Sequence, residues 1–360
     1  MTTNKLVSLT VVAAVLVGLA YFSSTSKKVK TPALVGKPVL TGFDLSEVAK
    51  IEAGASGGKK LALESTDSGW VIKSLHGYPA DIAKIRENLL KLKDLKVGHV
   101  AAGKKLAAPA LVDLQNAAGK SLAALRLGDK HMRQASGEMA QFGGGDFADG
   151  RYVSYVSAGG GDTVVLVKET LEAFDGDPKS WTDTQIASVP SADLTAIALT
   201  SGGKTAKLTK KNGAWTIDGL GPKEEFDTSK SYGVESALNY LNFNTVVDPA
   251  LTEEQLGLTT GSVYQVTLKN GESYTAKIGG ADKGGTDRYF RISAAFSPVG
   301  TNATENAALA KKVEAFNAKA GKWTYTIASY SADNMTKSRN DLVKAKEEPK
   351  KEDKKDEEKK

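Results

Sequence analysis

Residues 54–58 give this 360-residue chain a formal match to a nucleophile motif, because they read Gly-Ala-Ser-Gly-Gly. A Gly-x-Ser-x-Gly elbow presents its serine only when a strand precedes the turn and a helix follows it. Here a second strand-like segment follows, and residues 200–204, the matching stretch later in the chain, lack the first glycine. We therefore predict hairpin turns at both places and no nucleophilic serine.

Residues 119–121 and 203–205, Gly-Lys-Ser and Gly-Lys-Thr, resemble the end of a phosphate-binding loop. Such a loop also needs a glycine five residues before the second one, so that backbone amides can surround the phosphates. Leu114 and Ala198 occupy those positions, and strand-like segments follow. Both tripeptides are predicted to be turns.

The residues that bind metals are few. The chain has no cysteine, and His76, His99 and His131 lie 23 and 32 residues apart. These spacings exclude a helical His-x-x-x-His pair and any compact local group of ligands. We expect surface or loop histidines, no metal site and no cofactor.

Two acidic pairs carry the remaining chemistry. Asp146 and Asp149 lie in a glycine-rich stretch, and Asp175 and Asp177 flank Gly176. Paired carboxylates can hydrolyse a glycosidic bond, and oxygen-rich loops can bind calcium weakly. Neither pair recurs in the second half of the chain, so ordinary loop composition is the preferred interpretation. We predict no catalytic residue.

The elements that would position these residues occur twice. Trp70 and Trp215 each open the same ordered series of landmarks, at separations that vary only as small loop insertions allow. A repeat of this length indicates two domains rather than a solenoid of short units. The further landmarks are Asp81 and Asp227, Asn116 and Asn270, residues 127–130 and 278–283, residues 150–153 and 287–290, and Trp181 and Trp323.

Each repeat is predicted to be α+β, with a mostly antiparallel sheet and a covering helix. Asp81 and Asp227 are expected to be N-caps. The apolar stripes behind them are Ile82, Ile85, Leu89 and Leu92 in the first repeat, and Val234, Leu238 and Leu241 in the second. The predicted strands are 48–53, 60–64, 70–72, 112–115, 122–127, 152–157 and 163–167, then 195–199, 206–209, 215–217, 263–268, 273–278 and 289–292.

The N-terminus indicates export. Residues 6–22 carry no charge and form a stretch close to the minimum for a membrane span. A signal peptide cleaved near residues 24–26 is the alternative, but the bulky Tyr21 and Phe22 favour an uncleaved transmembrane helix. We expect the short end inside and the bulk of the chain outside, although the lysines after the span oppose the usual charge bias.

The C-terminus and the overall charge are less specific. Residues 344–360 mix lysines with acids, which is typical of a disordered tail. The net charge is +6, but the charges are spread along the chain and aromatic residues are few, so we expect no nucleic-acid partner. The expected division is an anchor or signal segment at 1–30, repeat domains at 31–190 and 191–335, and a charged tail at 336–360.

The ordered landmarks resemble those of the bacterial domain-of-unknown-function 4340 family, over roughly residues 40–335 and in both repeats. They include the strand-turn-strand before Gly69-Trp70, the Pro-Ala-Asp helix start, the Leu-Gly-Leu at 256–258 and the Arg-Tyr strands. The first repeat departs from the pattern with Leu-Ala-Ala-Pro-Ala-Leu at 106–111. The resemblance implies a membrane-anchored envelope protein, often encoded beside an ABC transport system, and it supplies no catalytic residues.

Three hypotheses about function follow. The first is a non-enzymatic, single-pass inner-membrane protein whose periplasmic domains bind or scaffold protein partners in an ABC-transporter or envelope complex. The second is a cell-wall glycan hydrolase that uses two of the four aspartates named above. The third is a glycan-binding module, which requires exposed aromatic rings at Trp70, Trp181, Trp215 or Trp323.

Overall fold

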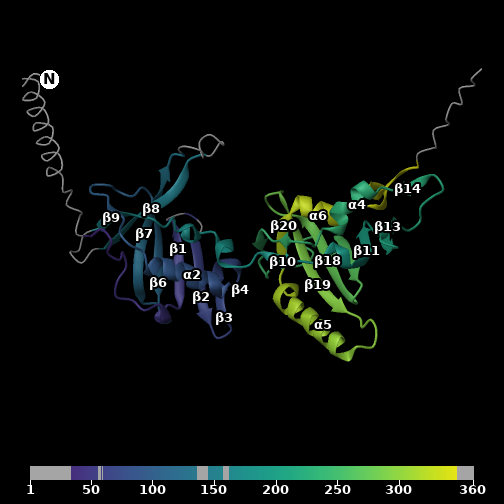
Figure 1. Ribbon diagram of the computed structural model, residues 1–360, viewed down its shortest axis with the longest axis horizontal. Coiled ribbons are helices and arrows are strands. Elements are labelled where there is room, and N and C mark those ends of the chain that lie inside the picture. The colour runs from purple at the N-terminus through teal and green to yellow at the C-terminus, as the bar shows by residue number, and fades with distance from the viewer. Residues whose placement is uncertain (1–33, 56–57, 59, 136–144, 157–161, 347–360) are drawn as a thin grey trace, which may run out of the picture. The chain divides into compact units, whose positions relative to one another are not determined.

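The computed structural model describes residues 34–55, 58, 60–135, 145–156 and 162–346. These residues form an α+β fold with two largely antiparallel sheets, of nine and eight strands, and few helices (Figure 1). The α+β class predicted from the sequence is therefore confirmed. The predicted transmembrane helix at residues 6–22 lies outside the described residues, and no helix within them is both long and apolar enough to cross a membrane.

The nine-stranded sheet has the order β4-β3-β2-β1-β6-β7-β8-β9-β5. Its strands are β1 (Lys50–Ala55), β2 (Lys60–Thr66), β3 (Gly69–Ile72), β4 (Tyr78–Pro79), β5 (His99–Val100), β6 (Ala110–Gln115), β7 (Ser121–Arg133), β8 (Phe147–Val156) and β9 (Asp162–Val167).

The eight-stranded sheet has the order β13-β12-β11-β17-β18-β19-β20-β16. Its strands are β11 (Leu194–Ser201), β12 (Lys204–Lys211), β13 (Ala214–Ile217), β16 (Thr245–Val246), β17 (Ser262–Leu268), β18 (Glu272–Ala281), β19 (Asp287–Phe296) and β20 (Tyr325–Ala328). Two short pairs lie beside it, β10 (Gln185–Ala187) with β15 (Leu241–Asn242), and β14 (Glu224–Phe226) with β21 (Val343–Ala345).

The two tryptophans that open the repeats lie at matching places in tight hairpins. Trp70 pairs with Ser65 across β2 and β3, and Trp215 pairs with Lys210 across β12 and β13. The second hairpin turns through Asn212-Gly213, both with positive φ, which is the backbone that a two-residue hairpin turn requires. Both rings are half-buried. The strands predicted at 70–72 and 215–217 are confirmed.

Helix α2 (Ile82–Lys93) lies across one face of the nine-stranded sheet (Figure 1). Asp81 caps it, because its Oδ1 accepts a hydrogen bond from the Ala83 amide at 2.8 Å. The predicted stripe is confirmed at Ile85, Leu89 and Leu92, which are buried. It is wrong at Ile82, which lies in the first turn and is 48% exposed, so the buried stripe starts one turn later than expected.

Helices α4 (Thr228–Glu235) and α6 (Ser329–Met335) contact each other, and α6 also packs on β17, β19 and β20 of the eight-stranded sheet. Asp227 caps α4 as predicted, with its Oδ1 accepting from the Ser229 amide at 3.0 Å. The predicted stripe of Val234, Leu238 and Leu241 is buried, although only Val234 lies within the helix. The buried Tyr264 hydroxyl donates to the Val234 carbonyl at 2.6 Å and fixes β17 against α4.

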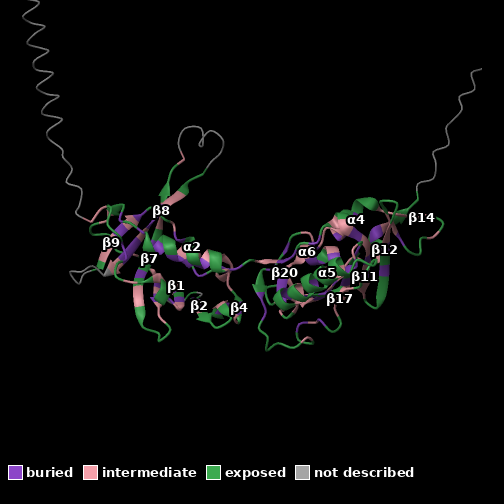
Figure 2. Ribbon diagram, turned by 60° about the horizontal axis from the view of Figure 1, so that its bottom comes forward, coloured by how far each residue is buried: buried purple, intermediate pink, exposed green. Residues whose placement is uncertain are grey.

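Helix α5 (Ala303–Phe316) interrupts the connection between β19 and β20 and continues into a π-helix, η6 (Asn317–Gly321). In the nine-stranded sheet the corresponding strands, β8 and β9, follow each other with only residues 157–161 between them. Val313 alone is buried among the residues of α5, and exposed positions dominate the helix in Figure 2. Helix α5 was not among the elements predicted from the sequence.

By contacts, the described residues divide into two compact units. One comprises residues within 1–58 and 87–175, and the other residues within 59–86 and 176–360. In the second unit, an aromatic cluster fixes Tyr78. Its ring centroid lies 5.3 Å from that of Phe243 and 5.1 Å from that of Trp323, and Phe243 stacks on Tyr325 at 5.3 Å. Burial raises the pKa of the Tyr78 hydroxyl.

Part of the stretch assigned to the charged tail is folded. Helix η7 (Arg339–Leu342) leads into β21, which pairs with β14. Glu224 accepts hydrogen bonds from Arg339 and from the Gly221 amide, and these lower the pKa of its carboxyl to about 2. Residues 347–360 lie outside the described residues.

Candidate functional site

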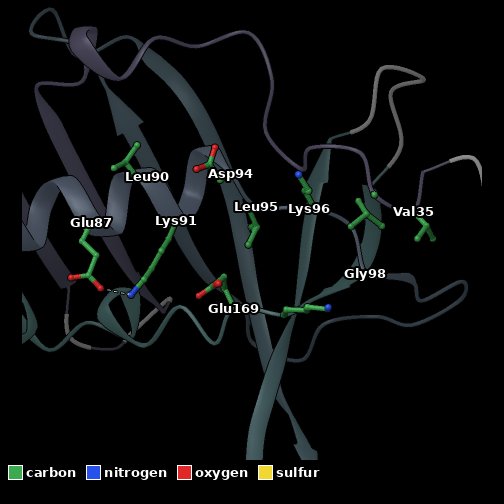
Figure 3. Close-up of a pocket in the computed structure, with 12 residues that line it drawn as sticks. Val35, Glu87, Leu90, Lys91, Asp94, Leu95, Lys96, Gly98 and Glu169 are labelled. Carbon is green, nitrogen blue, oxygen red and sulfur yellow. Dashed lines mark hydrogen bonds and ion pairs between the residues drawn. The ribbon is translucent and has the colours of Figure 1, made fainter.

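A hollow in the first unit has a volume of about 790 Å³. One wall is the exposed side of α2, at Glu87, Leu90 and Lys91 (Figure 3). The other walls come from the segment directly after α2 and from two segments that are distant in sequence. They are Val35 and Gly36, residues 94–98, and Lys168 and Glu169.

The segment just before the first strand forms one wall because it pairs with the chain that follows α2. The Gly36 amide donates to the Val97 carbonyl at 2.8 Å, the Val97 amide to the Lys37 carbonyl at 2.9 Å, and the Val39 amide to the Leu95 carbonyl at 2.8 Å. The Gly98 amide donates to the Leu166 carbonyl at 2.9 Å and attaches this pair to β9. A side chain at Gly98 would crowd that carbonyl, so glycine permits the close approach.

The hollow combines an apolar wall with a charged rim. Leu90 is 49% exposed on the wall, and charges of both signs surround it. Lys91 and Glu87 neutralise each other at 2.6 Å along the helix. The lining has no histidine, serine or cysteine. An exposed apolar surface with a polar rim is typical of a protein-binding or ligand-binding surface.

A second hollow, of about 350 Å³, lies in the second unit at the ends of β11, β17 and β18. Its walls are mostly glycine and hydroxyl-bearing residues, and Arg288 and Asp333 are the charged residues in its lining. The sequence analysis used Arg288 only as a landmark of the repeat. The consecutive glycines at 279–280, just before the residue that pairs with Arg288, were the signal that could have identified this place.

The four aspartates of the hydrolase hypothesis have separate surroundings. Asp175 pairs with Arg151, and Asp177 caps a short helix by accepting from the Lys179 amide at 3.0 Å. Asp149 lies 2.6 Å from His131 Nδ1, and this hydrogen bond lowers the pKa of the Asp149 carboxyl. Asp146 is exposed. None of the four lines either hollow described above.

The motifs predicted to be turns are turns where the structure describes them. Residues 119–121 lie at the β6–β7 turn and 203–205 at the β11–β12 turn, with glycines of positive φ at both. Residues 54 and 55 end β1 and β2 follows, so no helix succeeds the Gly-x-Ser-x-Gly match. Ser56 itself lies outside the described residues.

The histidines are dispersed. His76 terminates a short helix in the left-handed conformation, His99 lies in the edge strand β5, and His131 pairs with Asp149. Among the described residues, no group of three or more histidine, aspartate or glutamate side chains is placed to hold a metal ion.

The tryptophans are packed to different degrees. Trp181 is completely buried and cannot stack on a sugar. Trp70, Trp215 and Trp323 are half-buried, and the indole nitrogens of Trp215 and Trp323 are buried without a hydrogen-bond partner in the described part of the chain. The Trp323 ring packs against Tyr78, with 5.1 Å between the ring centroids.

The fold and its hollows define an α+β protein of two antiparallel sheets with at least two concave surfaces. The chain belongs to the family described as Domain of unknown function (DUF4340), whose model matches residues 70–260. The match is a single copy that begins in β3 and ends before β17, so it includes parts of both sheets. No curated protein and no solved structure matches the chain significantly.

Proposed function

We propose that this protein is a membrane-anchored, extracytoplasmic binding or scaffold protein that serves an ABC-transporter or other envelope complex in the inner membrane. The observation that carries the proposal is the hollow beside α2, where an exposed leucine lies on an apolar wall inside a charged rim. Such a surface suits a protein partner more than a reaction, because its lining offers no nucleophile supported by a base.

The position of this hollow in the chain supports a partner close to the membrane. Val35, in its wall, follows the proposed span at residues 6–22 by only 13 residues. Thirteen extended residues reach at most about 45 Å. If residues 6–22 are the anchor, the hollow therefore remains within reach of the domains that an envelope complex exposes above the bilayer.

The duplication expected from the sequence is part of the same proposal. Its support is the common strand order of the two sheets: β3-β2-β1-β6-β7-β8-β9-β5 in one and β13-β12-β11-β17-β18-β19-β20-β16 in the other. In both, a short strand that follows the first helix returns to the far edge of the sheet. Two copies of one scaffold offer two surfaces, which is useful to a protein that bridges partners.

A glycan hydrolase is the second candidate, but the surroundings of its aspartates favour it less. Asp175 and Asp177 already serve an ion pair and a helix cap. A glycosidase needs two carboxyl groups on opposite sides of one sugar bond. The surroundings of the tryptophans likewise give limited support to a glycan-binding module, because Trp181 is buried and the other rings are only half-exposed.

Crosslinking in membranes tests the proposed function. The full-length chain would carry a photo-crosslinking residue at Lys96, on the rim of the hollow, combined with Leu90→Asp or with Leu111→Asp. Leu90 and Leu111 are 49% and 50% exposed, and Leu111 lies on β6 outside the hollow. We expect Leu90→Asp to abolish crosslinks to a membrane or transporter subunit, because it places a charge in the apolar wall.

The Leu111→Asp control should retain these crosslinks. If the parent protein yields no envelope or transporter subunit, or if both leucine variants lose crosslinks equally, the proposed use of this surface is wrong.

A further inference from the structure

Arg151 and Arg288 occupy the same position in the two sheets. Arg151 lies on β8, between β7 and β9, and Arg288 lies on β19, between β18 and β20. Arg151 pairs with Val167 on one side, and Arg288 pairs with Ile327 in the same way. The two arginines therefore lie at equivalent positions of the backbone framework.

The strand on the other side of each arginine contains the same irregularity. The register of β7 with β8 shifts between Leu127 and Lys130, and that of β18 with β19 shifts between Ile278 and Ala281. In both sheets the bulge consists of two residues, and the first of them is a glycine. These residues are 128–129 in β7 and 279–280 in β18, and the next residue pairs with the arginine. A bulge redirects the side chains beside it.

In the first sheet the chain itself satisfies the arginine. Arg151 is 7% exposed, and its Nε donates to the Gly128 carbonyl at 2.9 Å. Its Nη1 donates to the Thr170 carbonyl at 3.2 Å and to the Asp175 carboxylate at 2.5 Å. Asp175 reaches this place because the segment after β9 folds back over the bulge.

In the second sheet the equivalent arginine lines the open pocket of about 350 Å³. No hydrogen bond or ion pair joins the Arg288 guanidinium to any described residue. The glycines in its walls permit close backbone packing: a Cβ at Gly279 would lie 2.3 Å from the Leu256 carbonyl oxygen, and one at Gly261 would lie 2.1 Å from that of Ile278. Hydroxyl groups also line the pocket: the Ser262 hydroxyl donates to the Ser201 hydroxyl at 3.0 Å, and Thr336 adds another hydroxyl.

The segment after β20 supplies no carboxylate that pairs with Arg288 as Asp175 pairs with Arg151. It forms α6, whose Asp333 lines the same pocket but is exposed and makes no ion pair with Arg288 within 4.0 Å. A guanidinium offers a planar fork of donors that matches a carboxylate, and in the first sheet the Asp175 carboxylate accepts from Nη1 of that fork. In the second sheet Arg288 lines the pocket, and no described residue accepts from its guanidinium.

We infer that the Arg288 pocket binds a carboxylate group supplied from outside the described residues, in the role that Asp175 fills in the first sheet. The carboxylate belongs to a small organic acid or to an acidic peptide segment, and both offer the same group to the same fork. Asp333, on the rim, repels this ligand and limits its affinity.

Isothermal titration of the full-length chain in detergent micelles tests the inference, with succinate and an acetylated, amidated triglutamate peptide as probes. We expect saturable binding of at least one probe. Arg288→Gln should weaken it at least about tenfold, because charge-assisted hydrogen bonds are lost. Asp333→Asn should strengthen it, since a repulsive charge is removed.

Arg291→Gln is the matched control. Arg291 lies on the same strand, pairs with Glu253 and is not in the pocket lining, so its loss should leave binding within about twofold of the parent, as for a surface change. A chain that ends at residue 346 shows whether the acidic residues of the tail compete. Binding that appears only after this truncation identifies the tail as the source of the carboxylate.

Two results would overturn the inference. One is the absence of saturable binding in both the full-length and the truncated chain. The other is a folded Arg288→Gln variant, judged by an unchanged thermal midpoint, that binds the probes as tightly as the parent. Neither result depends on whether the hollow beside Leu90 binds a partner.

Discussion

The two sheets share the order of eight strands, yet they differ in two connections. One joins the arginine-bearing strand to the next strand, β8 to β9 or β19 to β20, and the other is the segment that follows β9 or β20. In the nine-stranded sheet β8 turns directly into β9, and the following segment returns Asp175 to Arg151. In the eight-stranded sheet α5 and η6 separate β19 from β20, and the segment after β20 is a helix. The same framework thus yields a closed, self-neutralised position in one sheet and an open pocket in the other.

This contrast shows where specificity can arise in two sheets that share a strand order. Strand order, bulge and hairpins are common, because each is determined by local sequence and by pairing with a neighbouring strand. The unshared connections decide whether a polar side chain on the common framework is satisfied internally. Connections accept insertions at a lower cost than the sheet does, and function is concentrated in them for that reason.

The largest expected effect tests the closed side of the comparison. Arg151→Met should lower the free energy of unfolding by about 3 kcal/mol, because it removes the shared donor of two carbonyls and leaves the Asp175 carboxylate with only Lys130, at 3.5 Å, as its cation. Arg288→Met, at the matching place, should change the free energy by less than about 0.5 kcal/mol, as for a surface substitution. Urea unfolding followed by circular dichroism measures both values. Equal losses would show that Arg288 also has an internal partner and that the two positions are alike.

The sequence predicted those features that depend on a few neighbouring residues. Asp81 and Asp227 could be recognised as helix caps, and residues 119–121 as a turn, because cap and turn chemistry is local. Whether each of the two arginines is paired with a carboxylate could not be predicted. It depends on Asp175 and Asp333, which come close to them only after distant strands have paired. The local sequences around Arg151 and Arg288 are therefore similar, although the side chains that surround the two arginines differ.

Helix α5 is an intermediate case. Its N-cap is local, since Asn302 accepts a hydrogen bond from the Glu305 amide, and the pair could have been noticed in the sequence. Its docking is not local. Glu272, at the start of β18, is completely buried, and Lys312 of α5 is the cation that neutralises it. A charged residue at this place gives no sequence signal of burial, because burial requires the helix to have docked.

The second prediction tests whether α5 is an integral part of the second sheet. Lys312→Met should lower the free energy of unfolding by about 2 kcal/mol, because it leaves the carboxylate of Glu272 buried without its cation. The Tyr274 hydroxyl still donates to that carboxylate at 2.7 Å, which keeps the loss below that for Arg151. Lys311→Met, at the exposed neighbouring position, is the control and should have almost no effect. Similar unfolding curves for both lysine variants would mean that α5 is held by apolar contacts alone.

The smallest effect concerns the edge of the second unit, where β14 pairs with β21 instead of with β13. The ion pair of Arg339 with Glu224 joins these segments, and it lowers the pKa of Glu224 from 4.5 to about 2. A carboxyl whose pKa is lower in the folded state stabilises it at all pH values above the unfolded pKa. The stabilisation is therefore complete above about pH 4.5 and is lost as the pH falls through about 2. The backbone amides of Asp227 and Lys346 donate to the Leu342 and Lys223 carbonyls, and their hydrogen exchange should stay protected from pH 7 down to about pH 3 in the parent. In Glu224→Gln, exchange at these amides should be faster than in the parent at pH 7, and the difference should shrink as the pH falls through about 2, where the parent carboxyl takes up its proton. If the difference does not shrink over this range, the edge is held by β14–β21 pairing and side-chain shape, and the ion pair is incidental to it.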